Sequence, residues 1–242
     1  MKIFVSDTYE GMSRKACSDL LDAIQGIEFP LICPASGDTP AGLYKELVIR
    51  KQQDNLPLTG WSFVGLDEWV GMNEKDEGSC KFHLDNQLFR PLQVMEEDVC
   101  FFNGREKNLD LECERVEQYI QTRGGIDLAI VGLGMNGHVG MNEPNTVPSL
   151  GTHIAAIDPE TQKVGQKYFT EKKALTLGLT LGIANILASK YIYLLVNGSK
   201  KAGIVKKVIE GEISAGIPAS LLRHHEGLSI YLDSAAAQLL GS

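Results

Sequence analysis

An amide, an imidazole and a carboxylate follow one another closely in the stretch GLGMNGHVGMNEP, which spans residues 132–144. They belong to Asn136, His138 and Glu143. A histidine titrates near neutral pH and its ring can be held by polar neighbours, so this order suits a group that shuttles a proton. The alternative is a histidine that only packs in the core or lies on the surface. The glycines crowded around His138 favour a tight turn that points all three side chains at one small ligand.

The glycines of this stretch also match the dinucleotide-binding spacing G-x-G-x-x-G, at Gly132, Gly134 and Gly137. Such a site needs a long helix that opens at the third glycine, because the pyrophosphate rests on the N-terminus of that helix. Only six residues separate Gly137 from Pro144, which is too few for such a helix. The spacing therefore favours a turn that serves His138 over a nucleotide site.

A second polar segment, PASGDTP (residues 34–40), follows another apolar run. Pro40 suits the first position of a helix. The Ser36 and Thr39 hydroxyls, the backbone N–H groups of the turn and the helix N-terminus would together form a seat for an anion. An ordinary helix start capped by Asp38 or Thr39 is the alternative.

Two lysines in NGSKKA (residues 197–202), Lys200 and Lys201, open another predicted helix after an apolar strand. They could supply the countercharge for that anion. A solvated helix face is the alternative, and it is the usual place for lysines.

The segment LDEWVG (residues 66–71) carries two adjacent carboxylates, Asp67 and Glu68. In an extended chain they point to opposite sides, so only one can face a ligand. Leu66 and Trp69 make the neighbourhood apolar, which would raise the pKa of a carboxyl group toward that of a usable base. A capping pair that starts a turn is the alternative.

Short apolar runs alternate with longer amphipathic segments along the whole chain. The runs predict strands at residues 2–6, 29–35, 62–67, 126–133, 152–157, 191–196 and 228–232. The amphipathic segments predict helices at residues 9–24, 40–51, 80–88, 109–122, 181–188, 199–210 and 234–239. This alternation predicts an α/β fold, with a doubly wound, mostly parallel sheet and helices on both faces, in one domain over residues 1–242. In such sheets ligands bind beyond the carboxyl ends of the strands, so the four polar segments should meet there.

Composition narrows the possible partners. The chain of 242 residues has a net charge of -8, which argues against DNA or an acidic membrane surface as the main partner. Its five cysteines are scattered without metal-ligand spacing, and its five histidines do not cluster with carboxylates, so we expect neither a disulfide framework nor a metal site. The beginning of the chain does not read as a signal peptide and no apolar run is long enough to span a membrane, so we expect a cytoplasmic protein.

Taken together, the motifs resemble those of the glucosamine-6-phosphate deaminase/isomerase family. The phosphate loop of that family is similar to residues 35–40, its Asp-Glu-aromatic loop to residues 67–69, and its Gly-His-Asn-Glu-Pro loop to residues 132–144. The resemblance covers nearly the whole chain. It implies an aldose–ketose isomerisation of a hexosamine 6-phosphate, coupled to loss of ammonia, without a cofactor.

The same resemblance implies roles for single residues. Asp67 would move a proton between C2 and C1 of the sugar, and His138, oriented by Asn136 and Glu143, would open the pyranose ring. The residues implied in binding the phosphorylated substrate are Ser36, Gly37, Asp38, Thr39, Gly137, Lys167 and Lys201.

Some residues depart from the family pattern. Asn136 and Lys167 stand where many members carry Asp and Arg, and Trp69 and Cys80 stand where tyrosines are common. His153 and Ala155 replace the basic pair that binds an activator in the hexameric members, so we expect a monomer or a small homo-oligomer. Trp69 and several other segments resemble more closely the galactosamine-6-phosphate variant of the family, which favours that substrate over glucosamine 6-phosphate.

Two other functions are alternatives to this one. A 6-phosphogluconolactonase would share the phosphate loop and His138, but those enzymes look different at residues 67–69 and 142–144. A non-enzymatic sugar-phosphate sensor would need an attached DNA-binding segment, and the chain has no basic patch for one.

Overall fold

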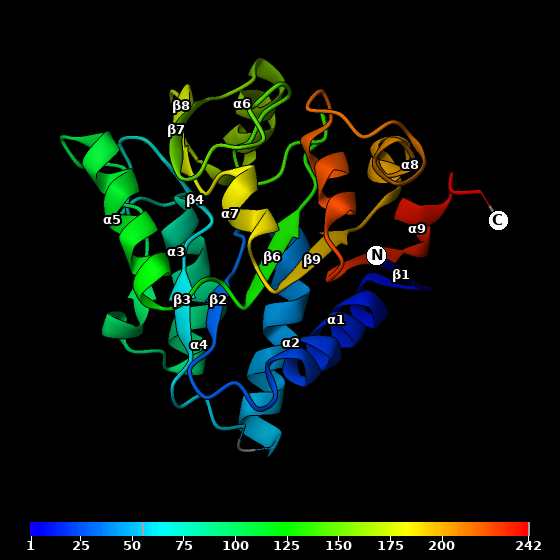
Figure 1. Cartoon of the computed structure of the whole chain (residues 1–242), viewed down its shortest axis with the longest axis horizontal. Helices are drawn as coiled ribbons and strands as arrows, with labels where there is room; N and C mark the ends of the chain where they lie inside the picture. Colours follow the sequence, from blue (N-terminus) through cyan, green and yellow to red (C-terminus); the bar gives the residue numbers. More distant parts are fainter. Residues whose placement is uncertain (55, 242) are drawn as a thin grey trace.

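The computed structural model, which describes residues 1–54 and 56–241, is built around a parallel sheet (Figure 1). Seven strands lie in the order β1-β10-β9-β6-β2-β3-β5, and every neighbouring pair is parallel. They are β1 (Lys2–Ser6), β2 (Leu31–Cys33), β3 (Ser62–Val64), β5 (Val99–Cys100), β6 (Leu128–Gly132), β9 (Tyr191–Val196) and β10 (Leu228–Asp233). The predicted α/β class with a mostly parallel sheet is confirmed.

Helices cover both faces of this sheet. The α-helices are α1 (Tyr9–Ile24), α2 (Asp38–Asp54), α3 (Cys80–Leu84), α4 (Arg90–Leu92), α5 (Leu109–Thr122), α6 (Pro159–Gly165), α7 (Ile183–Leu187), α8 (Ala202–Glu210) and α9 (Ser234–Ala237). Leu128 and Ile130 of β6 pack in a cluster with α1 and α2, whereas Ala129 and Val131 pack in the opposite cluster with α5 and α8. Because both faces of β6 are buried, its sequence is a continuous apolar run.

A second, smaller sheet lies apart from the first. It contains β4 (Asp67–Trp69), β8 (Leu177–Thr180) and β7 (His153–Ala156), which pair antiparallel in that order. In Figure 1, β7 and β8 lie with α6 at the top of the view. The strand predicted at residues 152–157 therefore exists but does not join the main sheet.

The predicted strand at residues 62–67 is wrong in its second half. The strand of the main sheet ends at Val64, and the next residue, Gly65, packs closely on Phe101, whose ring would lie 2.6 Å from a side chain there. Asp67 instead opens β4 of the small sheet. The candidate site residue Asp67 thus lies on a strand of the small sheet, not of the main sheet.

Other differences concern short elements. The sequence pattern did not predict β5, β8 or α6, although the pair Asp158-Pro159 is a typical helix start. Asp158 caps α6 by accepting a hydrogen bond from the Glu160 N–H at 2.8 Å. The helix predicted at residues 80–88 is an α-helix only to Leu84 and continues as a π-helical turn, η1 (Asp85–Phe89).

Short 3₁₀ segments complete the described chain. They are η2 (Glu96–Asp98), η3 (Gln166–Tyr168), η4 (Ser199–Lys201) and η5 (Pro218–His224). The helix predicted at residues 199–210 thus begins as η4 and continues as α8. Within residues 1–54 and 56–241, no helix combines the length and the apolar character needed to cross a membrane.

One buried carboxylate joins three central strands at their amino ends. Asp127 is 5% exposed. Its carboxylate accepts a hydrogen bond from the Leu31 N–H at 2.8 Å and forms an ion pair with Lys190 Nζ at 2.6 Å. The Asp127 backbone N–H donates to the Leu31 carbonyl at 2.9 Å, and the Asp127 carbonyl accepts from the Tyr191 N–H at 2.9 Å. The side chain therefore helps to align β2, β6 and β9, whose opposite ends carry the polar loops.

We expect Asp127→Ala to lower the free energy of unfolding by about 1–3 kcal/mol, because the buried N–H of Leu31 loses its partner. Lys190→Ala is the matched control. The Lys190 side chain is 63% exposed, so its loss should cost less than about 1 kcal/mol. Urea denaturation of the two variants measures both values, and equal losses would show that the ion pair, not the buried hydrogen bond, carries the effect.

Candidate functional site

The polar loops meet at the carboxyl edge of the main sheet. After β2 the chain turns toward β3, and after β6 it turns toward β9, so the crevice between β2 and β6 is the switch point where α/β folds bind ligands. Thr39 Oγ1 donates to Asn197 Oδ1 at 2.6 Å, and Lys201 Nζ donates to the Leu133 carbonyl. These bonds connect the loops that follow β2, β6 and β9.

Asp67 is buried at this edge, with 9% of its surface exposed. Burial raises the pKa of its carboxyl group to about 6, although a hydrogen bond from the Cys80 thiol and the nearby charge of His138 lower that pKa. A carboxyl group of this kind can accept a proton near neutral pH. Asp67 and His138, which are far apart in sequence, are therefore electrostatic neighbours.

Glu68 points to the opposite side of β4 from Asp67. Its carboxylate accepts hydrogen bonds from the backbone N–H groups of Trp69, Cys80 and Lys81, at 2.8, 3.0 and 2.9 Å. Two of these donors belong to the first turn of α3, where helix N–H groups lack partners within the helix. Of the two adjacent carboxylates, Asp67 thus lies beside His138, while Glu68 holds the start of α3.

The glycines of residues 132–137 make room for His138. A side chain at Gly134 would overlap the imidazole ring of His138, and the Gly134 N–H bonds to the His138 carbonyl at 2.9 Å. Gly137 has a φ of +89°, and its N–H bonds to the Gly134 carbonyl at 3.1 Å, so that N–H is used within the turn. No helix opens at Gly137, as expected from the distance to Pro144.

His138 is the end of a hydrogen-bonded chain. Asn136 Nδ2 donates to Glu143 Oε2 at 2.8 Å, and Asn136 Oδ1 lies 2.8 Å from His138 Nδ1. Since an ionised carboxylate only accepts, the Asn136 amide must present its oxygen to the ring, so Nδ1 carries the proton of the neutral imidazole. Nε2 is then the atom with a free lone pair.

The Glu143 carboxylate is ionised in this arrangement. Burial works against the charge, but hydrogen bonds from His138, Thr161 and Asn136 and the charge of His138 leave its pKa below the ordinary value. Glu143 Oε2 lies 3.5 Å from His138 Nδ1, so the carboxylate can also stabilise a protonated ring.

Thr161 of α6 is a site residue that sequence reasoning missed. Its hydroxyl lies 3.1 Å from His138 Nδ1 and also helps to lower the pKa of Glu143. Because Nδ1 has a single proton, Thr161 can share that proton as an acceptor and direct its own proton to the carboxylate. No local sequence pattern indicates this contact, since α6 reaches His138 only through the tertiary fold.

The segment predicted to seat an anion forms the start of α2. The helix begins at Asp38 rather than at Pro40, and Gly37 has a φ of +114°. The Asp38 carboxylate is 70% exposed and pairs with Lys167 Nζ at 2.6 Å, so it is bound to one of the two lysines implied in phosphate binding. Burial raises the pKa of the nearby Cys80 thiol, on which both Asp67 and Ser36 also act.

Lys200 and Lys201, which are neighbours in sequence, differ in their burial. Lys201 is partly buried, and burial together with the charge of Lys167 lowers the pKa of its ammonium group to about 8. Lys200 is exposed. Lys201 therefore faces the loops at the sheet edge, whereas Lys200 lies on a solvated face.

Trp69 and Cys80, which stand where tyrosines are common in the family, are both buried. The Trp69 ring is 7% exposed and packs against α6, where a side chain at Gly165 would lie 3.2 Å from it. Cys80 is 6% exposed, and its thiol is close enough to Asp67 and Ser36 for both to act on its pKa, which burial raises.

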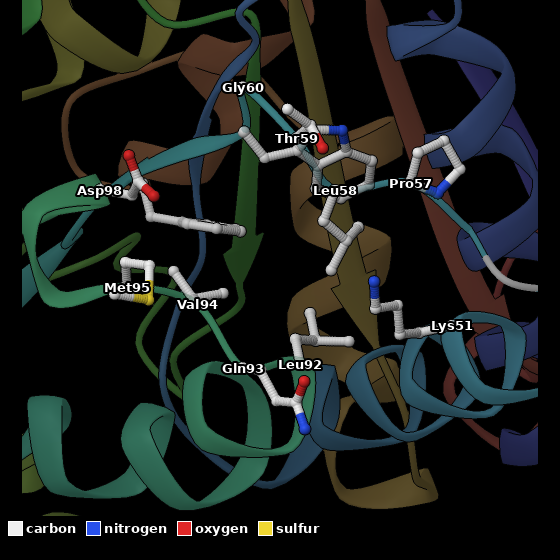
Figure 2. Close-up of a pocket in the computed structure, with 12 residues that line it drawn as sticks. Lys51, Pro57, Leu58, Thr59, Gly60, Leu92, Gln93, Val94, Met95 and Asp98 are labelled. Carbon is white, nitrogen blue, oxygen red and sulfur yellow. The ribbon is translucent and has the colours of Figure 1, made fainter.

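A separate cavity of about 330 Å³ lies at the other end of the strands (Figure 2). Trp61 and Asp98, which line it, directly precede β3 and β5, so the cavity opens at the amino edge of the sheet. It shares no residue with the polar loops. Over the described ranges, 1–54 and 56–241, no three His, Cys, Asp or Glu side chains group closely enough to hold a metal ion.

Comparison with known proteins gives full-length matches. A glucosamine-6-phosphate deaminase of Oceanobacillus iheyensis is 34% identical over 98% of this chain and 96% of its own length. Another, from Clostridium botulinum, is 35% identical over 99% of both chains. The solved structure of a monomeric glucosamine-6-phosphate deaminase superposes with a TM-score of 0.96 at 34% identity, covering 99% of this chain and 100% of that one.

More distant structures share the fold alone. A 6-phosphogluconolactonase from Trypanosoma brucei superposes with a TM-score of 0.75 at 20% identity, over 99% of this chain and 98% of that one. The family described as glucosamine-6-phosphate isomerases/6-phosphogluconolactonase matches residues 7–231. The chain therefore belongs to the glucosamine-6-phosphate isomerase/6-phosphogluconolactonase family.

Proposed function

We propose that this protein converts a hexosamine 6-phosphate to the ketose 6-phosphate and ammonia, with glucosamine 6-phosphate giving fructose 6-phosphate. The observation that carries the proposal is a buried carboxylate, Asp67, within electrostatic range of an oriented imidazole, His138, together with two lysines, Lys167 and Lys201, from separate segments. The reaction needs those parts: an acid-base group at the ring oxygen, a base at C1 and C2, and an anchor for the phosphate. The names of the full-length relatives support it.

His138 acts first, on the closed sugar. Its Nε2 accepts the proton of the C1 hydroxyl and delivers a proton to the ring oxygen, so the C1–O5 bond breaks and an open-chain aldehyde forms. The Asn136 and Glu143 chain holds the ring in the tautomer that leaves Nε2 free, and Glu143 stabilises the ring while it is protonated.

Asp67 acts next, on the open chain. Its carboxylate removes the proton from C2 while the aldehyde oxygen takes a proton from the ammonium group on C2, which gives an enolamine, and the protonated carboxyl group then returns its proton to C1. The resulting imine at C2 reacts with water to give the ketone and ammonia. A carboxyl group with a pKa of about 6 suits both directions of this transfer at neutral pH.

The phosphate is held at the start of α2. The Ser36 hydroxyl and the first N–H groups of the helix provide hydrogen bonds, and Lys201 and Lys167 provide charge. The Thr39 hydroxyl already donates to Asn197 and must turn to reach the phosphate. Such a site needs only local cations and is compatible with a net charge of -8.

The choice between the two epimers rests on the C4 hydroxyl. The resemblance to the galactosamine-6-phosphate variant rests on Trp69, whose ring packs in the core, and on several other segments of the chain. The names of the relatives favour glucosamine 6-phosphate. We also propose that the protein is a monomer, as the relative with the solved structure is by its name.

Ammonia release from purified protein tests the function directly. We expect release with glucosamine 6-phosphate and slower release with the galactosamine epimer, because a site that bonds one C4 hydroxyl leaves a polar group unpaired with the other. A kcat/KM at least tenfold higher for galactosamine 6-phosphate would reverse the choice of epimer, and no release from either would end the proposal.

Asp67→Asn should abolish exchange of the C2 proton with deuterated solvent while sugar-phosphate binding remains. In the unchanged protein, kcat/KM should fall as the pH drops through about 6, because the Asp67 carboxyl group gains a proton there and stops acting as a base. Glu68→Gln is the control, since it should reduce stability by removing an acceptor at α3 and keep the exchange. Normal exchange in Asp67→Asn would exclude Asp67 as the base.

The hydrogen-bonded chain predicts the tautomer of His138. Nitrogen-15 NMR should show Nδ1 protonated in the neutral ring, and Asn136→Leu should remove that preference. His138→Gln should slow turnover of the closed sugar by about 10²–10⁴-fold and affect an analogue locked open much less. A ring protonated at Nε2 in the unchanged protein would contradict this assignment.

Lys201→Ala should raise KM for the phosphorylated sugar by roughly ten- to a hundredfold, the value of one charge-assisted contact. KM should also rise with pH above about 8, where Lys201 loses its charge in the free protein. The exposed neighbour provides the control, because Lys200→Ala should leave KM within about twofold. The reverse order of the two variants would show that Lys200, not Lys201, faces the phosphate.

A further inference from the structure

The Tyr168 hydroxyl lies over the loop proposed to hold the phosphate. A side chain built at Gly37 would lie 3.3 Å from this oxygen. Tyr168 ends η3, the segment that also carries Lys167. The hydroxyl therefore comes to the start of α2 from a part of the chain more than a hundred residues away.

Two neighbours hold the aromatic ring in this place. His83 of α3 meets it edge to face, with the ring centroids 5.0 Å apart and the planes at 66°. Lys167 Nζ lies 4.6 Å from the centroid of the Tyr168 ring and also forms an ion pair with Asp38. Contacts of this kind give a ring a preferred orientation, so little freedom is lost when its hydroxyl binds a ligand.

The groups that meet the Tyr168 oxygen are donors. The backbone N–H of Asp38 and the ammonium group of Lys167 act on the phenol as donors, and both oppose the burial that raises its pKa. Burial, and then the charge of Asp38, raise the pKa of Tyr168, so the phenol keeps its proton. The oxygen thus occupies a point where donors converge, while its own proton can be directed to a further acceptor.

We propose that Tyr168 is a substrate-binding residue whose hydroxyl donates a hydrogen bond to a phosphoryl oxygen seated between the start of α2 and Lys167. The phosphoryl oxygen takes the donors that now meet the Tyr168 oxygen, and the hydroxyl moves aside to become a donor itself. This inference rests on the proposed function only in placing the phosphate at this loop. The ligand chemistry is an oxyanion with several acceptor oxygens, such as a phosphate monoester.

Calorimetric titration with inorganic phosphate tests the hydroxyl without requiring turnover. Tyr168→Phe keeps the ring, its contact with His83 and its contact with Lys167, and removes only the hydroxyl. We expect phosphate to bind about tenfold more weakly to this variant, which corresponds to about 1.4 kcal/mol. Tyr191→Phe is the matched control, because Tyr191 opens β9 at the opposite edge of the sheet, and its affinity should be unchanged.

Steady-state kinetics separate binding from a merely structural role. Tyr168→Phe should raise KM for the hexosamine 6-phosphate about tenfold and leave kcat within about twofold. Unchanged or tighter phosphate binding in Tyr168→Phe would overturn the inference, and so would a loss of kcat with unchanged KM. If the protein released no ammonia but phosphate binding still weakened in this variant, the proposed function would fail and the role of Tyr168 would stand.

Discussion

A side chain at residue 134 would overlap the imidazole of His138, and this close approach governs how the loop after β6 is built. The ring packs directly on the Gly134 backbone, and the two residues are joined by a backbone hydrogen bond of 2.9 Å. Asn142, fully buried, ties the loop to the small sheet by donating to the Leu181 carbonyl at 2.8 Å. With the backbone fixed on both sides, Asn136 and Glu143 can hold one edge of the ring and leave the other free.

The small sheet holds the buried carboxylate. The strand of the main sheet ends at Val64, and Asp67 opens β4 of the small sheet, where it pairs with Thr180. Thr180 Oγ1 in turn accepts from the Met141 N–H at 3.1 Å, in the loop that carries His138. The distance between the proposed base and the proposed ring-opening group is therefore set by backbone and buried hydrogen bonds rather than by mobile side chains, as precise proton transfer requires.

Charge is distributed to suit a small anionic substrate. The chain is acidic overall, yet Lys167 and Lys201 approach the start of α2 closely enough for the charge of Lys167 to lower the pKa of Lys201. Like charges held near each other repel, and an anion bound between them relieves that repulsion. The exposed Asp38 carboxylate already pairs with Lys167, so the proposed phosphate would compete with it for that lysine.

Local sequence was sufficient wherever neighbours along the chain determine the structure. The helices α1 and α5 have the predicted bounds, because their apolar spacing and the caps Thr8 and Asn108 are local signals. The turn around His138 followed from glycine spacing, and the opposite directions of Asp67 and Glu68 followed from strand alternation. The family resemblance, which depends on motifs in order, was confirmed by the match over residues 7–231.

Other features depend on pairings between distant segments, which no local pattern encodes. The sequence by itself determined which side chains could carry protons and bind phosphate, and on which strand ends or turns they stand. Only the tertiary structure decided that residues 153–156 pair with β8 and that the Trp69 ring packs away from the site. It also decided that Thr161 meets His138 and that Tyr168 meets Gly37. The physical reason is that hydrogen bonds and packing across a fold depend on how strands and loops are brought together in space, whereas helix periodicity, caps and turns depend on residues only a few positions apart.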